Sequence, residues 1–171
     1  MAIDHNKEVV HINTPYDAII IKLNSKLNST YISYGSLGST KMAMQYSQDT
    51  NAMELEQEVA VKRAVSKSSR LYNNKNWDLV DAAADDTFDV NKLKKHELPK
   101  ELQNKSTLEI TNYIELKKEE REKIQKEIQQ LNSMRKTYIE NNKKGSSKGE
   151  LESVMLSAIK KQAKEKNYSW E

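Results

Sequence analysis

The residues of this sequence best suited to chemistry are the acids that follow the tryptophan at position 77. Asp78 and Asp81 stand three residues apart, so on a helix their carboxylates share one face, as a general acid and a general base would. The same spacing is more often a charge bias at a helix start, where the helix dipole stabilises carboxylates. We therefore favour a structural role for both acids over an enzyme built around Trp77.

The chain lacks the patterns of established metal, nucleotide and nucleophile sites. Asp85, Asp86 and Asp89 offer oxygen ligands, but their stretch lacks the central glycine and alternate spacing of a calcium loop. The three histidines form no HExxH-like pattern, and there is no cysteine, GxSxG or glycine-rich phosphate loop. The sequence predicts no catalytic, cofactor-binding or metal-binding residue, and thus a protein that is not an enzyme.

Charge is unevenly distributed along the 171 residues. Residues 1–91 carry 9 Lys and Arg against 12 Asp and Glu, whereas residues 92–171 carry 19 against 13. In the basic half lysines alternate with glutamates, which is typical of a solvated helix face and not of a nucleic-acid surface. No apolar run approaches the roughly 18 residues of a membrane span. We expect a protein partner, no nucleic acid and no membrane span.

The elements that position these residues begin with a short strand-like segment, KEVVHI (residues 7–12), which either joins a sheet elsewhere or forms ordered coil. Thr14, Pro15 and Asp17 then form a strong helix start, with a hydroxyl N-cap, a proline and an acid. Behind them an apolar stripe predicts a helix that ends near Tyr34. The stripe consists of Tyr16, Ile20, Leu23, Leu27 and Tyr31.

Residues 41–73 hold no proline or glycine and are rich in helix-forming residues. One long helix fits, and so do two helices with a break near residues 49–52, which we prefer because these residues include N-cap types. We expect a seam of small apolar residues along this region, supported by larger ones. The expected positions are Met53, Leu55, Val59, Ala60, Val61, Ala64, Val65 and Leu71. Asparagines around Lys75 favour a turn, and Asn76 can cap a short helix that begins with Trp77, whose ring should fill the core.

The C-terminal half is dominated by one long predicted helix. Ser106 and Glu109 form a capping box that opens a helix at about 106–141. Four residues on a three-four repeat give this helix a possible partner face, which we expect to pack on another helix of the same chain; Arg135 interrupts the stripe. They are Ile124, Ile128, Leu131 and Tyr138. A second capping box at Ser147 starts a final amphipathic helix.

These elements define the expected architecture. The fold class is mainly α: a helical bundle or helical hairpins with one long helix and an isolated N-terminal strand-like segment. Residues 1–91 form one region and residues 92–171, with the long and the C-terminal helix, the other, packed together as one unit.

Four stretches, in chain order, resemble the end and helical extension of the von Willebrand factor type A domain in a group of bacterial proteins. They are HINTPYDAIIIKLNSKLNSTYISYG, SRLYNNKNWDLVDA, the segment from LPKELQNK to MRKTYI, and AIKKQAKEKNYSWE. The resemblance implies a C-terminal fragment of a secreted or periplasmic protein, with any divalent cation held in the missing upstream domain. No DxSxS or DxTxS motif is present, so none of that family's metal-binding residues transfers to this chain.

The leading hypothesis is therefore a non-enzymatic, structural or protein-interaction module of a bacterial von Willebrand factor A-like adhesion protein. The alternative is a helical scaffold that self-associates through the face at 124–138.

Overall fold

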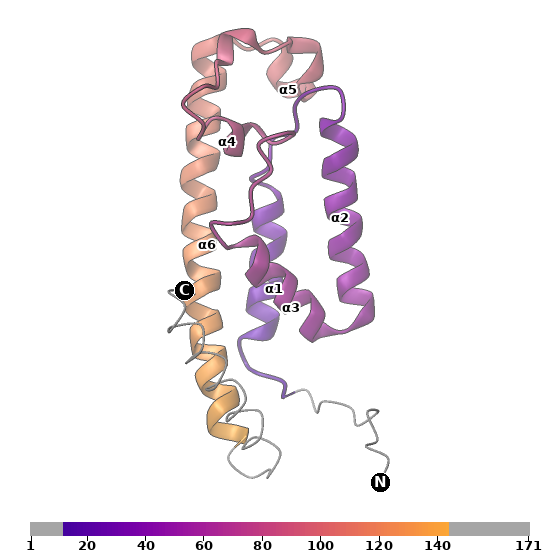
Figure 1. The fold of residues 1–171 in the computed structure, drawn as a ribbon, viewed down its shortest axis with the longest axis vertical. Helices are drawn as coiled ribbons and strands as arrows, with labels where there is room; N and C mark the ends of the chain where they lie inside the picture. Colours follow the sequence, from indigo (N-terminus) through magenta and orange to yellow (C-terminus); the bar gives the residue numbers. More distant parts are fainter. Residues whose placement is uncertain (1–11, 144–171) are drawn as a thin grey trace, which may run out of the picture. The chain divides into compact units, whose positions relative to one another are not determined.

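The computed structural model describes residues 12–143, and these residues are mainly α-helical, as predicted (Figure 1). In chain order the α-helices are α1 (Asp17–Asn28), α2 (Gly38–Leu55), α3 (Gln57–Lys67), α4 (Leu79–Ala82), α5 (Lys100–Gln103) and α6 (Thr107–Lys143). Two 3-10 helices, Val90–Lys92 and Lys95–Glu97, lie between α4 and α5. The chain divides into compact units 1–135 and 136–171, so residues 92–135 belong with the N-terminal half.

The start of α1 is fixed by the predicted cap. The Thr14 backbone N–H donates to Asp17 Oδ2 (3.1 Å) and the Thr14 hydroxyl donates to Asp17 Oδ1 (2.7 Å). The same hydroxyl accepts from the Tyr16 N–H (3.3 Å). Since these bonds satisfy groups that a helix start leaves without partners, the cap sets where α1 begins.

The end of α1 differs from the prediction, because the helix stops at Asn28 and not near Tyr34. The hydroxyls of Ser29 and Thr30 donate to the last-turn carbonyls of Lys26 and Leu27, both at 2.7 Å. The chain then extends and forms an isolated antiparallel bridge between Ser33 and Asp78. Tertiary hydrogen bonds available to an extended segment thus override the continuing helical pattern.

Residues 38–67 form two helices, with the break at Glu56 and not at 49–52. Glu56 is fully extended (φ −162°, ψ 148°), which ends α2 and opens α3. Of the expected seam, Ala60, Val61 and Ala64 are buried, whereas Met53, Leu55, Val59 and Leu71 are exposed. The predicted seam is therefore correct for α3 apart from Val59, and wrong for the C-terminal end of α2 and for Leu71, which lies beyond α3.

A first core cluster joins α1, α3 and α6, which Figure 1 shows alongside one another. Trp77 lies in it, as predicted, with its ring centroid 5.6 Å from that of Tyr31. The buried members are Ile20, Leu23, Leu27, Tyr31, Val61, Ala64, Trp77, Ile124 and Ile128. The apolar stripe of α1 is thus covered mainly by α3 and α6.

A second core cluster lies between the extended segment after α1, the short helices α4 and α5, and the first turns of α6. Its buried members are Ile32, Leu79, Val80, Leu98, Leu102, Ile110 and Ile114. Asp78, and not the predicted Asn76, caps α4 by accepting from the Asp81 N–H (3.1 Å). Helix α4 therefore starts two residues later than the sequence indicated.

The long helix α6 is confirmed, with bounds within two residues of those predicted. Its capping box is present: the Ser106 backbone N–H and hydroxyl both donate to Glu109 Oε2, at 2.8 and 2.7 Å. The Glu109 N–H donates to the Ser106 hydroxyl (3.3 Å). The predicted strand-like segment, apart from Ile12, and the predicted helix after Ser147 lie outside the described residues.

Candidate functional site

The four residues of the predicted partner face all lie in α6 but differ in burial. Ile124 and Ile128 are buried in the first core cluster, and Leu131 packs against it. Tyr138 lies in the second compact unit and is 37% exposed. As the chain is folded, Ile124 and Ile128 are not available to another copy, and self-association through the 124–138 face stays a prediction.

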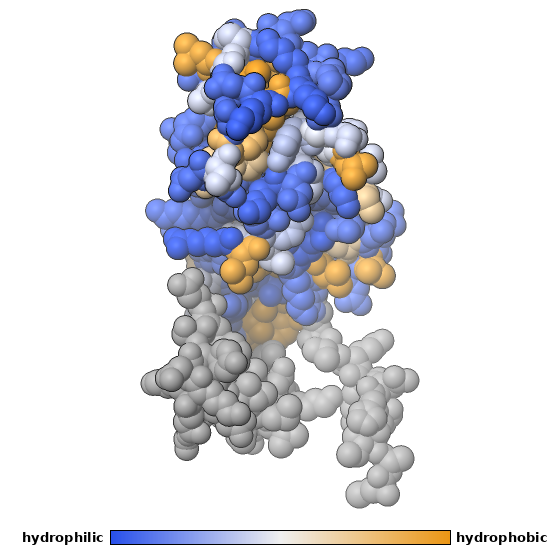
Figure 2. Space-filling model, turned by 45° about the horizontal axis from the view of Figure 1, so that its top comes forward, coloured by the Kyte–Doolittle hydropathy of each residue, from blue (hydrophilic) through white to orange (hydrophobic). Residues whose placement is uncertain are grey.

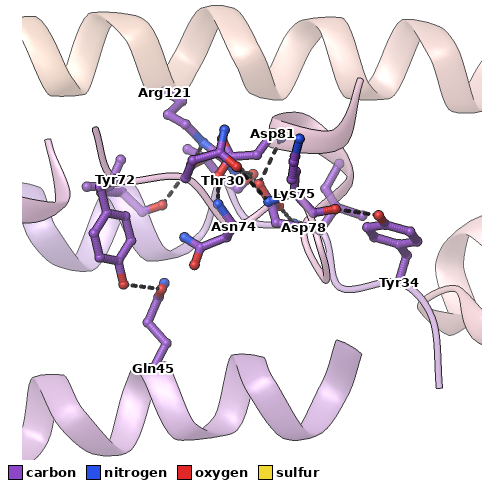
Figure 3. Close-up of polar contacts among 12 residues, drawn as sticks. Thr30, Tyr34, Gln45, Tyr72, Asn74, Lys75, Asp78, Asp81 and Arg121 are labelled. Carbon is purple, nitrogen blue, oxygen red and sulfur yellow. Dashed lines mark hydrogen bonds and ion pairs between the residues drawn. The ribbon is translucent and has the colours of Figure 1, made fainter. Parts of the chain in front are cut away.

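The predicted acid pair, Asp78 and Asp81, binds an arginine from α6 in the interior (Figure 3). Arg121 Nη1 donates to Asp78 Oδ2 and to Asp81 Oδ1, both at 2.7 Å. The Arg121 Nε donates to the Thr30 hydroxyl (3.0 Å) and Nη2 to the Thr30 carbonyl (2.8 Å). Asp78 also accepts from the Ile32 N–H (2.8 Å), so this network ties α6 to the extended segment.

The electrostatics of this network are those of a buried ion pair. Burial alone would lower the pKa of Arg121, but the carboxylates of Asp78 and Asp81 raise it overall. Burial raises the pKa of Asp81, although the charge of Arg121 opposes the increase. Asp78 is fully enclosed and the Asp81 side chain is 16% exposed, and Arg121 engages both carboxylates, so the pair supports the structure.

A second buried ion pair joins α6 to the start of α1. Arg135 Nε donates to Asp17 Oδ1 at 2.7 Å, and both side chains are almost fully buried. Burial opposes ionisation of Asp17, but hydrogen bonds from Thr14 and the charge of Arg135 bring its pKa below the usual value. The arginine that interrupts the apolar stripe of α6 therefore completes the cap of another helix.

A third polar group, which we call the Lys67 cluster, consists of Asn24, Asn28, Asp49, Arg63 and Lys67 from α1, α2 and α3. Every member except Asp49 itself has a side chain that donates to the Asp49 carboxylate. Lys67 is 0% exposed, and burial lowers its pKa to about 8 although Asp49 opposes the change. The pKa of Asp49 is lowered: burial opposes this, but the bonds from Lys67 and Asn28 prevail.

The Lys67 cluster borders a half-open groove of about 360 Å³ lined by α1, α2 and the start of α3. Ile21 from α1, Ala52 and Met53 from α2, and Ala60 from α3 supply its apolar surface. Asn24 also lines the groove, and its side-chain oxygen, Oδ1, is buried and accepts no hydrogen bond from the described residues. Seven of the twelve residues that line the groove are polar or charged, yet most of its exposed surface is apolar, a combination that a binding site can use.

The α2–α3 connection continues from this groove with alternating apolar and acidic residues. Met53 and Glu54 line the groove, and the chain proceeds through Leu55, Glu56 and Val59. Met53 is 51% exposed and Leu55 72% exposed. Figure 2 shows that apolar side chains form separate patches on a mostly hydrophilic face. Separate patches suit a small contact better than a large permanent interface.

Two charged residues at apolar positions of the sequence indicate these polar clusters, although none of the predictions above rests on them. Lys67 follows Ala60 and Ala64 at helical spacing, so it lies on the buried stripe of α3. Arg121 stands three residues before Ile124 and likewise lies on the buried stripe of α6. A charged residue at an apolar register position indicates a buried partner, but sequence alone does not say which acid supplies it.

Within residues 12–143 the structure brings no three histidine, aspartate or glutamate side chains together as a metal site. Asp85 and Asp89, from the rejected calcium loop, accept bonds from the Thr87 and Asn91 backbone N–H groups, both two residues on. In the described part of the chain, no helix has both the length and the apolar character needed to cross a bilayer.

Comparison of the chain with models of protein families, with curated proteins and with solved structures finds no match.

Proposed function

We propose that this chain is a non-enzymatic protein-binding module, and that the groove between α1 and α2 holds an apolar, basic segment of its partner. The observation that carries the proposal is the groove itself, with its apolar lining, its acidic extension along 53–59 and the acceptor on Asn24. A groove of this size accommodates a few side chains of a bound peptide, with the rest of the contact on the exposed rim.

Charge sets the sign of the expected partner. Glu54, Glu56 and Glu58 fall within five residues, and Glu58 also pairs with Lys62 (2.8 Å). Arg63 lies 2.5 Å from the Asp49 carboxylate, which also binds Lys67, so one anion serves two cations inside the cluster. The acidic part of this surface is therefore the connection at 54–58, and it should attract lysine or arginine on a partner more strongly at low ionic strength.

The wider setting we propose is the helical C-terminal part of a bacterial, secreted or periplasmic von Willebrand factor A-like protein. This rests on the four sequence stretches that resemble that family. Co-expression with the region encoded upstream would test it, because a positioning module should change the thermal stability of an adjoining adhesion domain. Two parts that melt independently would contradict the positioning role.

Peptide binding tests the groove directly. A labelled 16-residue amphipathic peptide of leucine and lysine is titrated with the protein and followed by fluorescence anisotropy, with a leucine–glutamate peptide as its counterpart. We expect the lysine peptide to bind and the glutamate peptide to bind at least about tenfold more weakly, a difference of about 1.4 kcal/mol.

Two matched variants locate the binding site. Met53→Lys places a positive charge in the groove and should weaken binding of the lysine peptide at least about tenfold, since the two cations repel and the new charge must be desolvated. Leu116→Lys makes the same change at an exposed position of α6 and should leave affinity unchanged. Equal affinity for both peptides, or equal effects of the two variants, would contradict a specific groove.

A further inference from the structure

An amine, an amide and a carboxylate meet in the Lys67 cluster at hydrogen-bond distance. Lys67 Nζ lies 2.5 Å from the side-chain carbonyl oxygen of Asn28 and 2.7 Å from Asp49 Oδ2. The Asn28 amide nitrogen donates to the same Asp49 oxygen at 2.6 Å. One carboxylate oxygen therefore touches both the amine nitrogen and the amide nitrogen.

The amine is also close to the amide carbon. A carbon–oxygen double bond is about 1.2 Å long, so the Asn28 Cγ lies within about 3.7 Å of Lys67 Nζ. Attack conformations place reacting atoms about 3 to 3.5 Å apart, a distance that a small movement of either side chain supplies. Lys67 and Asn28 are both buried, which limits competition from water.

We propose that Lys67 and Asn28 form an intramolecular amide bond after folding, with Asp49 transferring the proton. The neutral Lys67 nitrogen bonds to Asn28 Cγ, the Cγ–Nδ2 bond breaks, and Nδ2 leaves as ammonia. Asp49 takes a proton from the attacking nitrogen and returns one to the leaving nitrogen, so no oxidant or reductant is required. The new bond would join α1 to α3 covalently.

The surroundings of Lys67 favour the neutral amine that this step needs. Burial lowers its pKa to about 8, so about a tenth of the molecules carry the neutral amine at pH 7. The charged and titratable groups that face it are Asp49 from α2, Arg63 from α3 and Tyr31, whose ring centroid lies 5.8 Å from Nζ. Asp49 holds the amine in place and opposes its deprotonation, while Arg63 promotes it.

Intact mass spectrometry of the full chain tests the proposal. We expect a mass about 17 Da below that calculated from the sequence, the mass of one ammonia. Because cyclisation of an asparagine elsewhere would lose the same mass, a protease digest must also contain one branched peptide that joins the segments around Asn28 and Lys67. The conversion should become faster as pH rises toward 8 and level off above it.

Variants and a folding control make the outcome decisive. Lys67→Arg and Asn28→Ala should have their full calculated masses, and Asp49→Asn should convert at least about tenfold more slowly. Lys62→Arg, an exposed substitution on the same helix, should convert like the wild type. The proposal is overturned if folded wild-type protein, verified by circular dichroism, keeps its full mass after prolonged incubation at pH 9. It is overturned equally if the digest lacks the branched peptide, a result that needs no variant to fold.

Discussion

Replacing Arg121 by methionine should destabilise the protein strongly, because it removes the cation that binds the enclosed Asp78 and the mostly buried Asp81. The side chain makes four hydrogen bonds, two to carboxylates and two to Thr30. Asp78 would remain fully buried without its cation. Breaking a buried pair in this way costs about 3 to 5 kcal/mol, and methionine retains most of the apolar contact of the arginine stem.

The assays are urea unfolding, which gives the free energy of unfolding, and thermal unfolding, which gives the melting temperature, both at pH 7 and followed by circular dichroism. A loss of 3 to 5 kcal/mol corresponds to a decrease in melting temperature of roughly 6 to 20 °C for a chain of this size. Lys126→Met, an exposed substitution on the same helix, is the matched control and should change the free energy of unfolding by less than about 0.5 kcal/mol.

The pH dependence of this loss separates charge from packing. Burial raises the pKa of Asp81, and loss of Arg121 removes the charge that opposes the increase. A carboxyl whose pKa is raised on folding gives stability at low pH that is lost as pH rises through the folded pKa. The deficit of the variant relative to wild type should therefore shrink from pH 7 to pH 4. A loss below about 1 kcal/mol at pH 7, or an equal loss at both pH values, would refute the ion-pair reasoning.

Three further substitutions have defined outcomes in thermal or urea unfolding. Asp17→Asn leaves Arg135 buried without its anion and should cost about 3 kcal/mol near neutral pH. Because the pKa of Asp17 is lowered on folding, its contribution to stability is present above the usual carboxyl pKa and disappears as pH falls through the folded pKa. The variant should therefore lose less stability than the wild type on acidification. Gly35→Ala should cost about 1 kcal/mol through its φ of 77° alone, since a Cβ there meets no atom within 4 Å; a neutral effect would show that the turn adjusts. Ser106→Ala should cost about 1 kcal/mol by opening the capping box of α6, and an unchanged melting temperature would mean that packing alone sets this helix start.

Local signals in the sequence predicted much of the helical framework. The caps at Thr14 and Ser106 were identified because hydroxyl and acidic residues at fixed spacing satisfy a helix start by themselves. Trp77 was placed in the core because it buries the largest apolar surface of its region. The end of α1 was missed because Tyr31 continues the helical stripe, while the bonds that draw Ile32 out of the helix come from Asp78, 46 residues away.

The partners within the polar clusters could not be predicted from the sequence for a related reason. Asp49 looked like an N-cap, but in the fold it lies inside α2 and accepts from Lys67 and Arg63 on the next helix. The groove depends on how α1, α2 and α3 pack together, and no periodicity in one helix specifies that packing. Local sequence patterns therefore do not specify which charged residues, far apart in the chain, form ion pairs in the fold.

The most direct measurement of the proposed function is a nitrogen–proton correlation spectrum of the labelled protein, titrated with the leucine–lysine peptide. Our account predicts the largest chemical-shift changes at groove residues, with Asn24 and Met53 among them. It predicts little change at Leu116, which is an exposed residue of α6. Shifts concentrated at Leu116, or spread evenly over the surface, would contradict a protein-binding groove between α1 and α2.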